Sequence, residues 1–147
     1  MKSIRYILLL VVALTALGAS AKPLKTNQVY MFGFSASFQD STIYVTDIQD
    51  VQGAWIESKT KFLLGRDNYS YQLKEHFTNN LQEPDRICMV FYATSKSKAE
   101  KIKKKLLKKY VRNMNKKSKK NWKPYDVRYI TTAFFKFQPI DMSGDAQ

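Results

Sequence analysis

Basic side chains are concentrated in one stretch of the chain, residues 94–123, which we call the basic segment. It holds 14 Lys or Arg and a single acid, Glu100, while the whole chain of 147 residues carries a formal charge of +13. So many cationic groups close together attract anions such as phosphates, sulfates and carboxylates. The residues that we expect to bind an anionic partner are Lys101, Lys104, Lys105, Lys108, Lys109, Arg112, Lys116, Lys117, Lys119, Lys120 and Trp122.

The first half of the basic segment has the pattern of an amphipathic helix. Apolar residues recur at spacings of three and four, which places them on one face of an α-helix with lysines around the rest. These residues are Ala99, Ile102, Leu106, Tyr110 and Met114. Ser97 and Glu100 have the spacing of a capping box. The pattern predicts a helix from about Ser97 to Asn113, followed by a solvated loop that extends to Asn121.

The lysines of this helix are more numerous than solubility requires. Like charges four residues apart, such as Lys101 with Lys105, weaken a helix, whereas Glu–Lys pairs would strengthen it. The excess therefore indicates an anionic partner: lipopolysaccharide, an anionic glycan, a nucleic acid or a phospholipid surface. Tyr110, Trp122 and Tyr125 could stack on bases or lie at a lipid interface. Two alternatives remain: an interaction or structural protein with an acidic protein partner, or a solvated helix without a ligand.

The N-terminus has the pattern of an export signal. Lys2 and Arg5 precede a short apolar run over residues 7–17, and small residues follow up to Ala21. The run is shorter than the roughly 20 residues of a membrane-spanning helix. We therefore expect cleavage after Ala21, giving a periplasmic or secreted protein of 126 residues with a formal charge of +11.

The side chains needed for catalysis or metal binding are scarce. His76 is the only histidine and Cys88 the only cysteine, so a multi-histidine metal site or an internal disulfide cannot form. Cys88 lies in an apolar run, where a free thiol behaves as a small hydrophobic residue. No catalytic residue, metal site or cofactor is predicted, and a binding protein is favoured over an enzyme.

A β-hairpin is predicted at the start of the folded part. Residues 29–38 alternate between two faces, and the β-branched run 42–47 follows a turn at Gln39-Asp40. The predicted register pairs Phe34 with Val45 and Ala36 with Ile43, which places Tyr44 on the opposite face of the sheet.

The remaining elements complete a small α+β domain. A helix follows with core candidates Phe62, Tyr69, Leu73 and Phe77 and with Asp67 or Asn68 as its cap. The apolar run 87–92 predicts a central strand covered on both faces, and residues 127–130 and 133–137 predict one last strand or two. The order is ββαβαβ, a small mixed sheet in a two-layer sandwich with both helices on one face. We expect residues 22–28 to be a flexible lead-in, residues 29–140 one domain and residues 141–147 a polar tail.

The order of hairpin, helix, strand and helix over roughly residues 29–112 resembles the core of the GIY-YIG nucleases. Val29-Tyr30-Met31 and Ile43-Tyr44-Val45 stand where that family has its two motif strands, and Arg66 and His76 fall in the following helix. The resemblance implies an Arg, two tyrosines and a metal-binding Glu that converge for DNA cleavage.

The chain departs from this nuclease pattern at two points. The position of the family's Glu falls near Lys103, with Glu100 one turn earlier, and the predicted register separates Tyr30 from Tyr44. A degenerate nuclease is therefore a third alternative. Residues 29–38 and 62–73 also resemble small exported bacterial proteins with no assigned activity.

Overall fold

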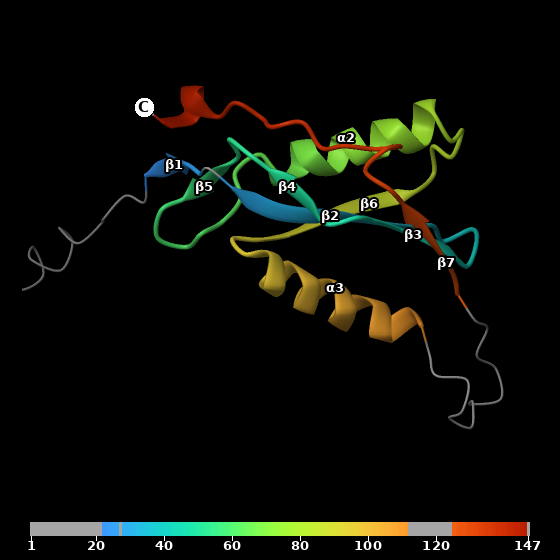
Figure 1. The fold of residues 1–147 in the computed structure, drawn as a ribbon. Helices are drawn as coiled ribbons and strands as arrows, with labels where there is room; N and C mark the ends of the chain where they lie inside the picture. The colour runs from blue at the N-terminus through green and yellow to red at the C-terminus, as the bar shows by residue number, and fades with distance from the viewer. Residues whose placement is uncertain (1–21, 27, 112–124, 147) are drawn as a thin grey trace, which may run out of the picture.

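The computed structural model describes residues 22–26, 28–111 and 125–146, and these residues form a small α+β fold (Figure 1). Its elements in chain order are β1 (Pro23–Lys25), β2 (Val29–Ala36), β3 (Thr42–Thr46), β4 (Gln49–Val51), β5 (Trp55–Glu57), α2 (Arg66–Asn79), β6 (Ile87–Ala93), α3 (Lys96–Tyr110), β7 (Asp126–Ile130) and the 3₁₀ helix η1 (Ser143–Ala146). In the described part of the chain, no helix combines the length and the apolar character that a membrane span requires.

Strand β2 is the centre of the main sheet. It pairs antiparallel with β6 on one side and with β3 and β4 on the other, and β7 lies parallel to β3. The predicted hairpin register is confirmed, because Phe34 pairs with Val45 and Ala36 with Ile43. The predicted lead-in is extended but not free, since β1 pairs with β5 in a second, two-stranded sheet.

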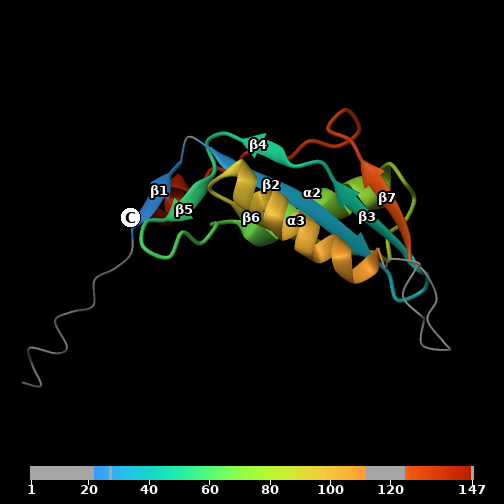
Figure 2. The ribbon, with the colours of Figure 1, turned by 60° about the horizontal axis from the view of Figure 1, so that its bottom comes forward.

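The two helices lie on opposite faces of the sheet, so the prediction of a two-layer sandwich is wrong. Figures 1 and 2 show α2 on one side of β2 and α3 on the other. Alternate residues of β2 divide between the two sides: Met31 packs in the cluster of α2, while Phe32 and Phe34 pack in that of α3. Because β2 is apolar on both faces, both faces need a cover.

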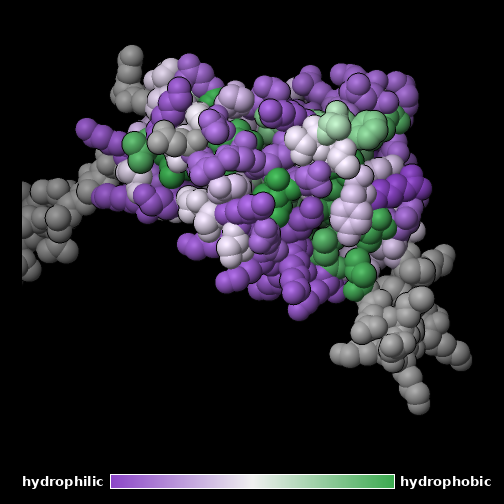
Figure 3. Space-filling model, viewed as in Figure 1, coloured by the Kyte–Doolittle hydropathy of each residue, from purple (hydrophilic) through white to green (hydrophobic). Residues whose placement is uncertain are grey.

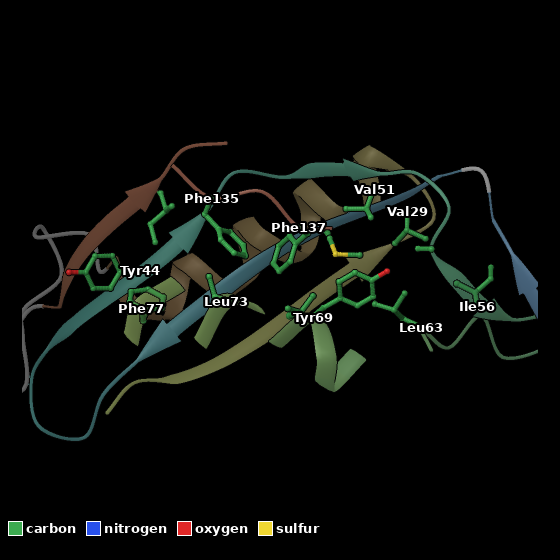
Figure 4. Packing of buried hydrophobic residues seen from close by; sticks show 14 residues of the cluster. Val29, Tyr44, Val51, Ile56, Leu63, Tyr69, Leu73, Phe77, Phe135 and Phe137 are labelled. Atoms are coloured by element: carbon green, nitrogen blue, oxygen red, sulfur yellow. The ribbon is translucent and has the colours of Figure 1, made fainter. Parts of the chain in front are cut away.

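The face under α2 contains the larger of the two clusters (Figure 4). Tyr69, Leu73 and Phe77 are buried there as predicted. Phe62 is 49% exposed and is not a core residue. The predicted cap is also wrong, because the residue before the helix is Gly65 in the left-handed conformation, with φ 65°, and no side chain caps the helix. Glycine adopts this conformation without steric cost.

Strand β6 is an edge strand rather than the predicted central one. It pairs with β2, and no other described strand lies along its second side. Ile87 and Met89 are 45% and 39% exposed, because α3 covers only part of their face. Phe91 stacks on Phe32 with ring centroids 5.3 Å apart. At the edge, Arg66 Nε donates to the Val90 carbonyl at 3.1 Å. The apolar run thus reflects packing on two sides, not a central position.

Residues 133–137 do not form the predicted strand. A side-chain amide takes the place of a partner strand: Gln49 Nε2 donates to the Phe135 carbonyl at 2.9 Å, and Phe137 N donates to Gln49 Oε1 at 2.9 Å. Phe135 and Phe137 are buried with their rings 4.7 Å apart. The alternating pattern therefore reflects real burial of Phe135 and Phe137, but the Phe135 carbonyl and the Phe137 N–H bond to the side chain of Gln49 and not to a neighbouring strand.

The buried Arg86 forms ion pairs and a hydrogen bond at the end of the sheet near the hairpin turn. Arg86 Nη1 binds Asp40 at 3.0 Å and Glu83 at 2.7 Å, and Nη2 donates to the Thr42 carbonyl. Its guanidinium lies 4.6 Å from the centre of the Tyr44 ring. Burial alone would raise the pKa of Asp40, but the Thr42 N–H and Arg86 hold it below its ordinary value. Arg86 thus joins the hairpin to the connection between α2 and β6.

Candidate anion-binding surface

Helix α3 carries the described part of the basic segment and begins one residue earlier than predicted. Ser95 stands at the N-terminal cap with φ −140°, and no side chain caps the helix. Ala99 N donates to the Ser95 carbonyl at 3.1 Å. Ser97 and Glu100 are exposed and lie inside the helix, so the predicted capping box does not form.

The apolar stripe of α3 fixes the helix to the sheet as predicted. Ala99 is buried, and Ile102, Leu106 and Tyr110 are partly buried against Phe34 and its neighbours. The Tyr110 ring lies 5.2 Å from the rings of both Phe34 and Tyr125. Tyr110 is therefore a packing residue, and its ring is not free to stack on a ligand.

Five of the predicted site residues lie on the outer surface of α3. Lys101, Lys104, Lys105, Lys108 and Lys109 are all exposed. Within the described ranges, none of these five lysines forms an ion pair with a carboxylate. Their charges are therefore not offset by a direct ion pair with another described residue. The other predicted residues, Arg112, Lys116, Lys117, Lys119, Lys120 and Trp122, lie outside the described residues.

Lys103 differs from these five lysines. Lys103 is half-buried, and its Nζ donates a hydrogen bond to the Thr46 carbonyl at 2.8 Å. The same Nζ lies 6.0 Å from the ring centre of Phe32 and 5.8 Å from that of Tyr129. Burial lowers the pKa of Lys103, although Asp47 acts in the opposite direction. Partial burial of Lys103 could have been inferred from the sequence, because residue 103 lies beside the apolar stripe that Ala99, Ile102, Leu106 and Tyr110 form on the helix.

A groove of about 460 Å³ runs between α3 and β7. Its apolar lining comes from Ile48, Leu107, Val111 and Tyr129. Its charged lining comes from Lys103, Lys104 and Lys108, with Glu100 as the single acid. In Figure 3, hydrophobic surface appears beside the hydrophilic surface of α3 on the side that faces β7. The sequence did not reveal this groove, because Ile48, α3 and β7 are far apart along the chain.

The residues suited to catalysis do not meet in this region. Burial raises the pKa of the Cys88 thiol, whose Sγ lies 3.6 Å from Ser35 Oγ. The His76 ring packs against Phe135 with centroids 5.1 Å apart. Among the described residues, no group of three His, Cys, Asp or Glu is placed to hold a metal ion.

The positions that resemble the GIY-YIG motif are spread over the fold. Tyr44 lies in the cluster under α2, whereas Tyr30 alternates with Met31 and so faces the side of α3. Arg66 is bound to the Val90 carbonyl, and Lys103 to the Thr46 carbonyl on the other face. These four side chains therefore do not converge.

No protein-family model, curated protein or solved structure matches this chain. Function is therefore inferred from α3 and the groove beside it.

Proposed function

We propose that the protein is an exported, small basic binding protein whose α3 surface contacts an anionic partner. The observation that supports this most strongly is the set of five exposed lysines on one helix, none with a carboxylate partner among the described residues. Arg112, Lys116, Lys117, Lys119, Lys120 and Trp122 would extend the surface along the chain.

The arrangement of the lysines favours binding over mere solubility. Between residues 96 and 110 there are eight lysines and one glutamate, so lysines four residues apart repel each other along the helix. An anionic partner would relieve this repulsion, which Glu100 offsets only for the lysines next to it on the helix. Lipopolysaccharide, glycan, nucleic acid and phospholipid surfaces all present suitable anionic groups, and an acidic protein surface is the alternative partner.

Two variants with the same loss of charge test the proposal. In the first, Lys101, Lys104, Lys105, Lys108 and Lys109 become Gln. In the matched control, five exposed lysines elsewhere in the described chain become Gln: Lys22, Lys25, Lys59, Lys61 and Lys136. Binding of heparin, duplex DNA and anionic vesicles is titrated at two salt concentrations.

We expect wild-type binding to fall steeply with salt, because cationic side chains displace counterions from a polyanion. The α3 variant should bind weakly with a flatter salt dependence, while the control variant should keep most of the affinity. Equal losses in both variants would mean that net charge alone drives binding. Absence of binding near about 0.15 M salt would leave the lysines as a solubility device.

A further inference from the structure

The groove between α3 and β7 combines an exposed apolar surface with a cationic one. Binding of a polyanion would require only the cationic surface. The apolar surface is open to solvent: Val111 and Tyr129 are 55% and 57% exposed, and Ile48 and Leu107 are partly exposed beside them. The other is cationic, with Lys104 and Lys108 exposed along the same side of the helix. Removal of apolar surface from water is favourable. A ligand with an apolar part would therefore gain binding free energy by covering these side chains.

We propose that this groove binds the hydrocarbon chain of a single-chain anionic amphiphile of the long-chain fatty acid type. The carboxylate lies near Lys104 and Lys108, and the chain lies over Leu107, Val111 and Tyr129. This inference rests on the proposed function, since it names the ligand class for one side of the same helix.

The shape of the site supports a single chain. Its volume of about 460 Å³ lies in the range of small-molecule pockets, roughly 300–1,000 Å³. Its walls come from α3 on one side and from β7 with Ile48 on the other. A single chain can lie along the boundary between these two walls with one side open to solvent.

Charge supports an anionic ligand. Lys103 at the groove already donates to the Thr46 carbonyl, which leaves Lys104 and Lys108 to pair with a carboxylate. The segment of this chain that follows Val111 is a poor occupant by charge, because residues 112–124 contain six Lys or Arg and no acid. An external anion is therefore the better match.

The first test varies the chain length of the ligand. Octanoate, decanoate and dodecanoate, each below its micelle concentration, are titrated calorimetrically into the protein, with dodecyltrimethylammonium as a cationic ligand of equal length. We expect affinity to rise about two- to fourfold for each added methylene, since burial of a methylene is favourable, and we expect the cationic ligand not to bind. Affinity that ignores chain length, or equal binding of the cation, would overturn the inference.

The second test uses two lysine pairs with identical spacing. K104Q/K108Q removes the pair beside the groove, and K101Q/K105Q removes an equally exposed pair outside it. We expect the first to weaken dodecanoate binding about tenfold and the second less than about twofold, because a direct charge-assisted hydrogen bond is lost only in the first. Equal losses would contradict the proposed position of the carboxylate.

The third test alters the apolar lining. Tyr129→Thr keeps a residue suited to a strand but removes the ring from the groove, and Tyr71→Thr is its control, since Tyr71 is exposed on α2. Only Tyr129→Thr should weaken dodecanoate. Heparin binding separates the two proposals, because heparin would contact the whole cationic surface of α3, to which both lysine pairs belong, and its binding should fall equally with both pairs. Heparin or vesicle binding without fatty acid binding would overturn this inference and leave the proposed function standing.

Discussion

The two faces of the sheet are covered by helices that differ in how deeply their side chains are buried and in how much charge they expose. Helix α2 buries Tyr69, Leu73 and Phe77 completely, whereas α3 buries only Ala99 and leaves the rest of its stripe partly exposed. Helix α3 also carries the exposed lysines and one wall of the groove. Most of the packing energy therefore lies on the α2 face, and the α3 face is free to carry charge.

The residues that the sheet presents to the two helices also differ. On the α2 side they include the small residues Gly33, Ser35 and Thr46, all buried, and the Leu73 side chain reaches so close to Gly33 that a Cβ there would lie 2.5 Å from Leu73 Cδ2. On the α3 side they include the aromatic rings of Phe32 and Phe34. Side chains of α2 therefore fill space that small sheet residues leave, whereas those of α3 pack on aromatic rings.

The same substitution on the two helices should show the largest difference. Leu73→Ala should cost about 2–5 kcal/mol of unfolding free energy, because it leaves a cavity in a fully buried site. Leu106→Ala should cost about 1–2 kcal/mol, because a half-buried side chain removes less apolar area from water. Urea denaturation measures both. Equal costs would contradict the view that α2 contributes most of the packing energy.

The contact between the Leu73 side chain of α2 and Gly33 of β2 can be tested by substitution. A Cβ at this position would lie 2.5 Å from Leu73 Cδ2, so Gly33→Ala should destabilise the protein by about 1–3 kcal/mol through overpacking. Gly144→Ala is the control, because nothing lies within 4 Å of its Cβ, and it should be nearly silent. The double variant with Leu73→Ala should cost less than the sum of the two single changes, since the clash disappears.

The α2 face should also respond to pH through His76. Burial lowers the pKa of His76, although a hydrogen bond with Asn80 opposes the shift. As the pH falls below the ordinary value of about 6.5, the unfolded chain therefore takes up the proton first. The stabilising contribution is complete above that pH and is lost as the pH falls through the folded pKa.

A comparison with His76→Gln isolates this contribution. The unfolding free energy of the wild type should decrease more than that of the variant between about pH 7.5 and pH 5. Other groups titrate equally in both proteins, including Asp40, whose lowered pKa acts at more acidic pH. Parallel curves for the two proteins would exclude His76 as the source.

The smallest effect is expected on the α3 surface. Replacing Lys101, Lys104, Lys105, Lys108 and Lys109 by Gln should stabilise the helix by about 0.2–0.5 kcal/mol for each like-charged pair that is removed. Lys103→Ala should instead cost about 1 kcal/mol, because the Thr46 carbonyl loses its donor. Thermal unfolding at low salt measures both. A loss of stability in the five-residue variant would show that these lysines pack rather than remain free.

The sequence predicted the features that depend on local periodicity. The alternation of residues 29–38 gave the hairpin register, and spacings of three and four gave the stripes of both helices. The side on which each helix packs was missed, because β2 is apolar on both faces. In addition, the polar residues Ser35 of β2 and Thr46 of β3 are buried on the α2 side rather than exposed.

The candidate site could be predicted only in part for a related reason. The lysines are visible in composition alone, but the groove needs Ile48 and Tyr129 to meet Leu107. Likewise, Gln49 could not be recognised as the partner of residues 135 and 137, since no pattern links one glutamine to a stretch so far along the chain. Such long-range contacts depend on the strand order and not on local sequence.

The edge of β6 that pairs with no other described strand gives the α3 lysines a second consequence, for association between copies of the protein. An open strand edge with exposed Ile87 and Met89 is a surface on which two copies could add strand to strand. Helix α3 packs directly against β6 and β2, so such an approach would bring two strongly cationic helices together. Their mutual repulsion is screened by salt. The helix for which we propose an anionic partner would therefore also keep copies of the protein apart, most effectively at low ionic strength.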